Sequence, residues 1–289
     1  MLIDSMYIAA PQNLPVSVIF GLLGLLFGSF LNVVIYRLPK MMQHDFDNYV
    51  AGQQDRELPH PAKFNLMVPR SACPHCGHAI SAMENIPIIS YLMIRGRCVG
   101  CKAPISPRYP LIESLTGLIS IMLIWHFGSG MAGMASLLFA YFLIAMAAID
   151  FDTQLLPDDL TLPLLWLGLV INSQGLFCSL EDAVFGAVFG YLSLWSIYWI
   201  FKLLTGKEGM GYGDFKLLAA LGAWCGWIQL PVIILISSLM GAVIGLIMIW
   251  RSKLERNTPF SFGPYLALAG LIALPFGPVL TRLYLGSIS

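Results

Sequence analysis

The chain has 289 residues, of which 57% are hydrophobic and only 11% are charged, and its formal net charge is zero. A soluble domain is typically about 45–50% apolar and about 25% charged, so these residues cannot cover a water-facing globule. The zero net charge gives no sign of a nucleic-acid-binding surface. The composition therefore excludes an ordinary soluble domain and favours a protein that crosses a membrane several times.

Apolar residues gather in long runs separated by short polar segments, which predicts an all-α polytopic membrane protein with about eight transmembrane helices. No basic residue precedes the first run, so we interpret it as a retained helix and not as a cleaved signal peptide. Glycine pairs spaced as G-x-x-x-G in several runs favour close helix packing. The predicted spans are 15–36, 111–127, 134–149, 160–173, 183–204, 215–230, 231–250 and 262–280.

Lysine and arginine fall almost entirely on one side of these spans. Nine lie in the segment 37–108, and Arg251, Lys253 and Arg256 lie between the last two spans. Fifteen of the 16 share one face, because only Arg282 falls on the other. By the positive-inside rule the basic face is cytoplasmic, so we expect both termini on the opposite side.

The segment 38–110 differs from the rest because it is polar, rich in proline and holds four of the six cysteines. We expect a small cytoplasmic domain here, inserted between the first and second helices. The N-terminus and first helix then occupy 1–37, and a seven-helix membrane domain occupies 111–289. A domain of this size cannot build a large core, so it needs an additional cross-link.

Cys73, Cys76, Cys98 and Cys101 form two C-x-x-C motifs separated by 21 residues. Four thiolates at this spacing are typical of a tetrahedral, zinc-ribbon-like site. Four sulfur ligands leave no open position for water, which favours a structural zinc ion over a catalytic one. A disulfide pair is the alternative interpretation, and a reducing cytosol disfavours it.

Two predicted cytoplasmic loops place an aspartate at the end of a helix. Asp150 closes the third span and Asp214 opens the sixth, on the same face of the membrane. Two carboxylates that share a site resist ionising together, so one can donate a proton while the other accepts one from water. This pair predicts an aspartyl protease. Gly211 and Gly213 can adopt positive φ and would let an extended substrate approach Asp214 closely.

The alternative interpretation is that the acidic residues are helix caps. Asp158 and Asp159 immediately precede the fourth span and suit an N-cap role, and Asp214 could also be only an N-cap. Asp150 does not fit this interpretation, because an acid at a helix C-terminus opposes the helix dipole. Asp152 could take the role of Asp150 if the third helix ended later than predicted.

The sequence lacks the residues that other kinds of membrane protease require. The sequence has no H-E-x-x-H motif for a zinc protease, and only His126 lies near a span, at the end away from the aspartates. A transporter that uses Asp150 and Asp214 as a proton relay is a further alternative. No acidic residue lies deep inside any predicted span, which argues against transport.

Further motifs run along nearly the whole chain and surround these cysteines and aspartates. They are Gly28-Ser29-Phe30-Leu31-Asn32-Val33-Val34, Arg37-Leu38-Pro39, Ser90-Tyr91-Leu92, Arg108-Tyr109-Pro110 with Glu113, Leu156-Pro157-Asp158, Gly209 to Lys216 and Phe262-Gly263-Pro264-Tyr265. Through them the sequence resembles the type IV prepilin peptidases, which are bifunctional leader peptidases and N-methyltransferases among the G-x-G-D aspartyl proteases.

The resemblance implies that the substrates are prepilins of type IV pili and pseudopilins of type II secretion, cut at the cytoplasmic face of the bacterial inner membrane. The basic leader is removed, and the new N-terminal residue is methylated with S-adenosylmethionine. The family's catalytic pair falls on Asp150 and Asp214, and its zinc ligands fall on the four cysteines. Gly96 occupies a glycine linked to methylation, while no Rossmann-type pattern marks the methyl-donor site. A peptidase without methyltransferase activity is the alternative within the family, and the intact cysteine motifs argue against it.

Overall fold

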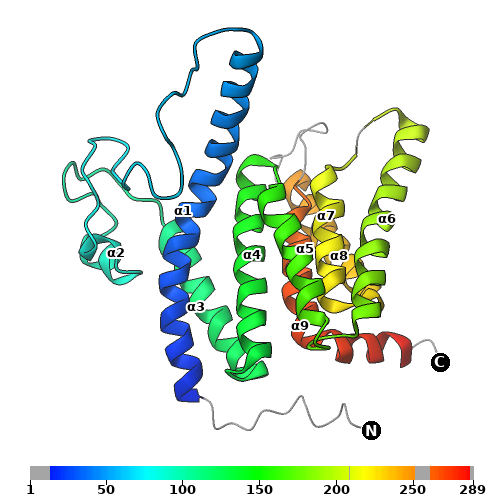
Figure 1. Cartoon of the computed structure of the whole chain (residues 1–289). Helices are drawn as coiled ribbons and strands as arrows, with labels where there is room; N and C mark the ends of the chain where they lie inside the picture. Colours follow the sequence, from blue (N-terminus) through cyan, green and yellow to red (C-terminus); the bar gives the residue numbers. More distant parts are fainter. Residues whose placement is uncertain (1–13, 208, 251–260, 287–289) are drawn as a thin grey trace. The chain divides into compact units, whose positions relative to one another are not determined.

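The protein is all-helical in the part that the structure describes, which is residues 14–207, 209–250 and 261–286 of a computed structural model (Figure 1). No strand occurs within these ranges, so the all-α prediction is confirmed. The chain divides into two compact units, Met1–Gly128 and Ser129–Ser289. The basic residues Arg251, Lys253 and Arg256, used above to orient the spans, lie outside the described residues.

The first unit is built on two long helices that pack along each other through glycines. A Cβ on Gly28 would lie 2.7 Å from the Cα of Glu113, and a Cβ on Gly24 would lie 3.0 Å from the Cα of Gly117. Only residues without side chains allow so close an approach, as the G-x-x-x-G pattern predicts. The elements of this unit are α1 (Leu14–Gln53), η2 (Met83–Asn85), α2 (Ile89–Met93) and α3 (Arg108–Phe127).

Helix α1 continues beyond residue 36, where the predicted first span ends, and reaches Gln53. The chain that follows then folds back along this extension. The buried guanidinium of Arg37 donates hydrogen bonds to the carbonyls of Asn65 at 2.8 Å and Pro69 at 2.6 Å. Asn48 exchanges two hydrogen bonds with the backbone of His60. The polar segment is therefore anchored on a helix that the composition change at residue 37 did not reveal.

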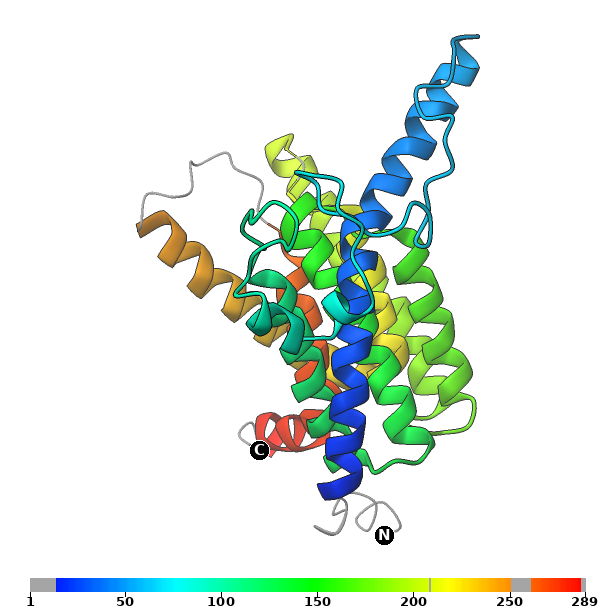
Figure 2. The same cartoon turned by 90° about the vertical axis from the view of Figure 1, so that its left-hand side faces the viewer.

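The second unit surrounds a short central helix, α7, with longer ones. Helix α7 packs against α5, α6 and α9, and it is buried from Asp214 to Trp224 with the exception of Lys216. Figure 2 shows α8 inclined to the other helices of this unit. Its elements are α4 (Met131–Thr153), α5 (Asp158–Asn172), α6 (Leu180–Thr205), α7 (Tyr212–Cys225), η3 (Trp227–Gln229), α8 (Leu230–Trp250) and α9 (Gly263–Gly286).

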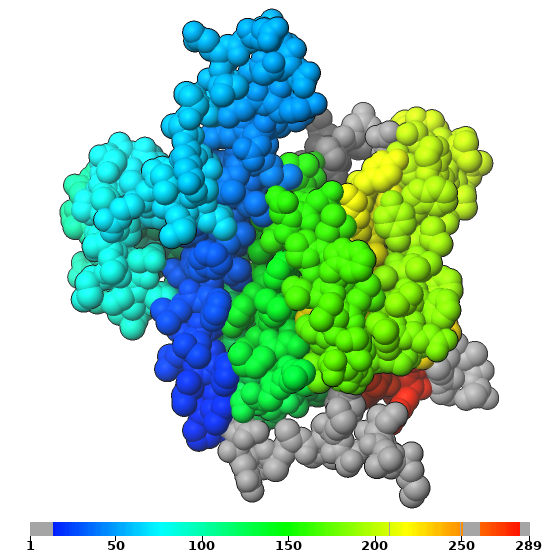
Figure 3. All heavy atoms as spheres, in the orientation of Figure 1, coloured from blue at the N-terminus to red at the C-terminus, as the bar shows by residue number. Residues whose placement is uncertain are grey.

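Glycines and one buried tryptophan hold α7 in its central position. The backbones of Gly186 on α6 and Gly222 on α7 are in direct contact, so neither position has room for a side chain. The indole of Trp224 is fully buried and donates a 2.8 Å hydrogen bond to the carbonyl of Leu164 on α5. Spheres of α5 and α6 cover most of α7 on the face seen in Figure 3. The helix that carries Asp214 is thus fixed on several sides.

Six of the described helices are long and apolar enough to cross a membrane, which fits a multi-pass membrane protein. Helices α5 and α7 have 15 and 14 residues, or roughly 22 Å at 1.5 Å per residue, against a hydrocarbon core of about 30 Å. Eight spans therefore remain a prediction. The six are Leu14–Gln53, Arg108–Phe127, Met131–Thr153, Leu180–Thr205, Trp227–Met248 and Gly263–Leu283.

Candidate active site

Asp150 lies in the last turn of α4, as predicted, and its side chain is buried, with 4% of its surface exposed. The helix ends at Gln154, whose left-handed backbone turns the chain and whose amide donates to the carbonyl of Asp150. The amide of Gly263, the first residue of α9, donates a 3.0 Å hydrogen bond to Oδ2 of Asp150. Asp150 is therefore a buried, oriented carboxylate at the end of a helix.

Asp214 lies in the first turn of α7 and is also buried, with 7% exposed. The N-cap position belongs to Gly211, and Asp214 lies three residues further on, where its carboxylate interacts with the backbone amide of Gly211. The alternative that Asp214 serves only as an N-cap is therefore wrong. A carboxylate in the first turn still benefits from the positive end of the helix, so its burial is partly offset.

Both aspartates line one cavity of about 330 Å³ in the second unit. Burial raises the pKa of Asp214 above its usual range, and the nearby carboxyl group of Asp150 raises it further, so the two groups interact electrostatically. The structure therefore brings together, from two helices, the two aspartates that the sequence analysis singled out, although they lie 64 residues apart in the chain. The lining residues are Asp150, Gln154, Leu156, Gly209, Met210, Gly211, Gly213, Asp214, Ser261 and Phe262.

The glycines beside Asp214 serve a different purpose from the one predicted. Gly211 has a φ of −81° and Gly213 lies inside α7, so neither uses the positive φ that the sequence analysis invoked. What matters is the missing side chain. A Cβ on Gly213 would lie 2.6 Å from the Cβ of Leu156, and one on Gly209 would lie 2.9 Å from the ring of Phe201. Gly213 thus lets the start of α7 approach Leu156 in the cavity wall, and Gly209 lets the preceding loop approach Phe201 of α6.

The neighbouring acids are not helix caps. Pro157 occupies the N-cap position of α5, so the N-cap prediction for Asp158 and Asp159 is wrong. Asp158 instead accepts hydrogen bonds of 2.7 and 2.8 Å from the ammonium of Lys216 on α7. This ion pair joins the starts of α5 and α7 next to the cavity. Asp152 is exposed and does not line the cavity, which leaves Asp150 as the partner of Asp214.

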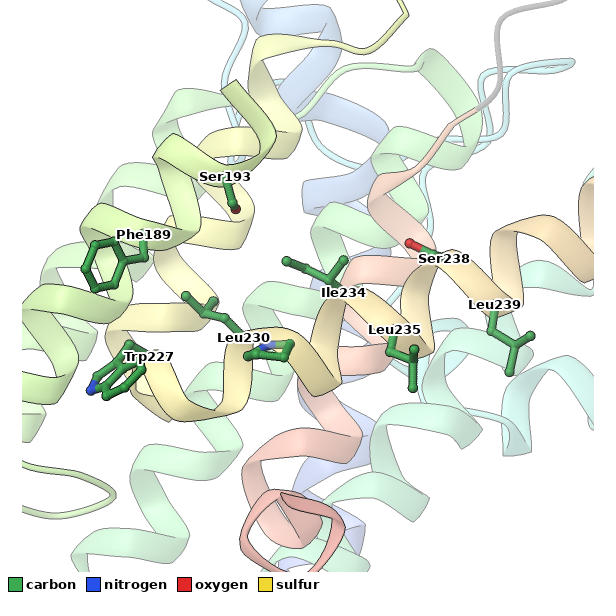
Figure 4. Close-up of a pocket in the computed structure, with 9 residues that line it drawn as sticks. Phe189, Ser193, Trp227, Leu230, Ile234, Leu235, Ser238 and Leu239 are labelled. Atoms are coloured by element: carbon green, nitrogen blue, oxygen red, sulfur yellow. The ribbon is translucent and has the colours of Figure 1, made fainter. Parts of the chain in front are cut away.

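A larger cavity of about 870 Å³ lies elsewhere, between α6 and α8 (Figure 4). Its lining residues include no carboxylate, histidine, lysine or thiol, so its two serines, Ser193 and Ser238, have no base among these residues to activate them as nucleophiles. It is an apolar groove, and the smaller cavity is the candidate active site. The groove is lined by Phe189, Ser193, Trp227, Leu230, Pro231, Ile234, Leu235, Ser238 and Leu239.

The four cysteines of the C-x-x-C motifs form one cluster, with their sulfur atoms all within 4.8 Å of one another. Cys73 and Cys101 are 3.8 Å apart, and Cys76 and Cys98 are 3.9 Å apart. A tetrahedral ion with Zn–S bonds of about 2.3 Å separates its sulfurs by roughly 3.8 Å. The cluster therefore fits a metal ion, and these separations are far longer than a disulfide bond of about 2 Å.

The two cysteine motifs fold as repeats of each other. The amide of Cys73 donates to the carbonyl of His78, and the amide of Cys98 donates to the carbonyl of Ala103, both at 2.9 Å. Backbone amides of His75 and of Cys76 lower the pKa of the Cys73 thiol to about 7, whereas burial and the neighbouring cysteines raise the pKa of the Cys76 thiol to about 11. Cys73 is therefore the cysteine of this turn that more readily gives the thiolate that a metal binds. Such paired turns present four sulfurs to one point, as the spacing predicts.

Gly96 lies two residues before Cys98 and has a φ of +63°, a left-handed conformation that favours glycine. Its carbonyl accepts a 2.7 Å hydrogen bond from the amide of Ile105, which closes the turn. A Cβ at this position would lie 2.8 Å from the hydroxyl of Tyr91. This turn therefore favours a bare backbone at residue 96, while the link of Gly96 to methylation stays a prediction.

A polar network that the sequence analysis did not predict joins the cysteine segment to α1 and α3. Buried Glu113 accepts a 2.8 Å hydrogen bond from the amide of Ile88, whose φ of +60° is unusual for a β-branched residue. The side-chain amide of Asn32 on α1 donates to the carbonyl of Tyr109 on α3 at 3.1 Å, and the hydroxyl of Ser29 on α1 donates to Oδ1 of Asn85 at 3.5 Å. Glu113 and Asn32 belong to motifs quoted above without a role. Each is a polar residue inside an apolar helix, and this feature of the sequence could have revealed the contacts.

Comparison with known proteins places this geometry in a family. A model of the Bacterial Peptidase A24 N-terminal domain matches residues 22–127, and a model of the Type IV leader peptidase family matches residues 137–246. A prepilin leader peptidase/N-methyltransferase of Stutzerimonas stutzeri is 60% identical over 266 residues, which cover 91% of each chain. The chain belongs to the type IV leader peptidase family. No solved structure matches it.

Two more members of the type IV leader peptidase family carry the same descriptive name. The protein of Pseudomonas aeruginosa is 59% identical over 265 residues, covering 91% of each chain, and that of Aeromonas hydrophila is 56% identical over 266 residues, covering 91% and 92%. The resemblance noted from the motifs is therefore confirmed. The four cysteines lie in the segment matched by the first family model, and both cavity aspartates lie in the segment matched by the second.

Proposed function

We propose that this chain removes the leader peptide of prepilins with Asp150 and Asp214 and then methylates the new N-terminal residue. The observation that carries the proposal is that two buried aspartates from separate helices line one cavity. The relatives described as prepilin leader peptidase/N-methyltransferase, up to 60% identical over most of the chain, supply the substrate class and the second activity.

In the proposed cleavage, one carboxylate accepts a proton from a water molecule while the water oxygen bonds to the scissile carbonyl carbon. The other carboxyl group donates its proton to the carbonyl oxygen. Collapse of the tetrahedral intermediate breaks the C–N bond. The departing nitrogen takes up the proton that the first carboxylate had accepted from water, and the second carboxylate takes a proton back from a hydroxyl of the intermediate. The products are the leader's new carboxyl terminus and the new amino terminus of the pilin. Neither a metal ion nor a covalent intermediate is required.

We further propose that the four cysteines hold a structural zinc ion. The ion would cross-link the two repeated turns, and four sulfur ligands would leave it no position for water. Methyl transfer from S-adenosylmethionine is assigned to the unit that contains these cysteines, with Gly96 as a suspected contributor. The residues that bind the methyl donor remain unassigned.

The proposed location is the bacterial inner membrane, with the aspartates at the cytoplasmic face. All but one of the basic residues fall on the predicted cytoplasmic side, and the leader of a prepilin is basic. The same rule keeps such a leader inside while the apolar part of the pilin spans the membrane. The scissile bond would then lie at the depth of the helix ends that carry Asp150 and Asp214.

The test is to incubate the purified chain with a prepilin and labelled S-adenosylmethionine, and to follow both the peptide and the label. We expect a shortened pilin that carries the label on its new N-terminal residue. Cleavage without labelling would identify a peptidase that lacks the second activity. An intact prepilin, under conditions in which a homologous enzyme cleaves it, would contradict the proposed function.

A further inference from the structure

Asp150 lies at an unfavourable place for a carboxylate, because the C-terminal end of a helix carries partial negative charge. The start of α9 compensates for this. The amide of Gly263 donates to Oδ2 of Asp150 at 3.0 Å, and the hydroxyl of Ser261 donates to its backbone carbonyl at 2.9 Å. Two residues from one segment thus hold both the side chain and the backbone of Asp150.

We propose that the start of α9, from Ser261 to Gly263, is the positioning element that fixes Asp150 for cleavage. This inference rests on the proposed role of Asp150 as a catalytic carboxylate. Ser261 fastens the end of α4, and Gly263 sets the direction of the carboxylate. With Oδ2 bound to the amide, Oδ1 is the oxygen that remains for water. The arrangement assigns to Asp150 the acceptance of the water proton and to Asp214 the protonation of the substrate carbonyl.

The amide of Gly263 is suited to this role by its place in the helix. The first amides of a helix have no acceptor within it, and they point outward with partial positive charge. Gly263 is the first residue of α9, and Pro264, which follows, has no N–H to offer. The helix therefore presents the amide of residue 263 to Asp150, and the dipole of α9 favours negative charge there.

The absence of a side chain at residue 263 is equally necessary. A Cβ there would lie 2.7 Å from Oδ2 and 3.1 Å from Cγ of Asp150. It would also lie 3.1 Å from Cδ1 of Leu156. These are the ends of side chains and not backbone atoms, so the fold can accept a methyl group if the carboxylate moves. An alanine at residue 263 should consequently displace the carboxylate while the helices stay in place.

The test compares Gly263→Ala with Gly270→Ala, the same substitution about two turns further along the same helix. Gly270 also packs tightly against side-chain ends, those of Leu221 and Leu143, but it does not contact Asp150. Misplacing a catalytic group by about 1 Å can cost about 10²-fold. We therefore expect Gly263→Ala to lower kcat for prepilin cleavage by about 10²-fold with KM unchanged. Gly270→Ala should keep the wild-type kcat.

Folding is read separately, from the thermal unfolding midpoint and from methylation of a pre-cleaved peptide, which both alanine variants should retain. A wild-type kcat in Gly263→Ala, or equal losses of kcat in the two variants, would overturn the proposal. If Gly263→Ala does not fold, Ser261→Ala decides, because it removes one hydrogen bond without adding bulk. We expect about a 2- to 10-fold lower kcat with KM unchanged, and an unchanged kcat would overturn the proposal.

Asp150→Asn separates this inference from the proposed function on which it rests. An inactive Asp150→Asn together with a fully active Gly263→Ala would reject the positioning role alone. Robust cleavage by Asp150→Asn would instead reject the aspartate pair, and with it the reason to position Asp150.

Discussion

Asn172, at the end of α5, holds the buried end of the helix that carries Asp214. Its side-chain amide donates to the carbonyls of Ala223 at 2.8 Å and Trp224 at 3.1 Å, in the last turn of α7. Its side-chain oxygen, Oδ1, accepts from the backbone amides of Phe177 at 3.0 Å and Cys178 at 3.3 Å. One side chain with 1% exposure thus satisfies four backbone groups in an apolar surrounding.

Asn172→Ala would remove the partner that Asn172 supplies to each of those four groups, and the carbonyl of Trp224 would keep a weak contact with the thiol of Cys178 at 3.9 Å. An unsatisfied buried group costs about 1–3 kcal/mol, but neighbouring groups relax together, so the sum overstates the effect. Since single substitutions rarely exceed about 4–5 kcal/mol, we expect a loss of about 3–5 kcal/mol in the free energy of unfolding. For a unit of this size the unfolding midpoint should fall by roughly 6–20 °C.

The assay is thermal unfolding in detergent, followed by the intrinsic fluorescence of tryptophan, because buried Trp224 packs against Phe139 and Phe177. Ser173→Ala is the matched control. Its hydroxyl is exposed and bonds only within its own helix, so the midpoint should stay close to that of the wild type. If Asn172→Ala had the same unfolding midpoint as Ser173→Ala, the role assigned to Asn172 would be refuted.

Three further predictions concern the cysteine cluster and the surroundings of the cavity. Elemental analysis should find about one zinc ion per chain, lost when Cys73 and Cys98 become serine, and freshly reduced wild-type protein without metal would contradict the site. Gly96→Val should impair methylation more than cleavage, because it strains a turn at positive φ, and equal losses in a folded variant would count against that division. Lys216→Met breaks a partly exposed ion pair with Asp158, so the free energy of unfolding should fall by at most about 1 kcal/mol and cleavage should persist. Loss of cleavage in this variant would contradict that expectation and give Lys216 a catalytic role.

The helical architecture could be predicted because membrane helices are written in the sequence as long apolar runs. The positions of Asp150 and Asp214 at helix ends follow from the same pattern, since a charge marks the point where an apolar run stops. The cysteine cluster could be predicted because two C-x-x-C motifs place four sulfurs on two short turns. In each case the sequence pattern lies within one short segment or two, and the structure contains the predicted feature there.

The remaining features depend on contacts between distant segments, which no local pattern encodes. Asp158 looked like a cap because it precedes an apolar run, but Lys216, 58 residues later, binds it. Gly213 looked like a turn residue, yet the neighbour that requires a glycine there is Leu156. Helix α1 continues to Gln53 through Pro39, because its polar end is covered by the chain that folds back onto it. Such features need the tertiary fold.

We propose that Asp150 and Asp214 act as one catalytic unit, which is tested by measuring kcat for prepilin cleavage by Asp150→Asn, Asp214→Asn and the double variant. Asparagine keeps the size of the side chain but cannot exchange the protons that cleavage requires. Each single variant should lose about 10²–10⁴-fold, and the double variant should be hardly slower than either. Asp159→Asn, exposed and outside the cavity, is the control and should cleave normally. Robust cleavage by Asp214→Asn, or losses that multiply in the double variant, would contradict the account.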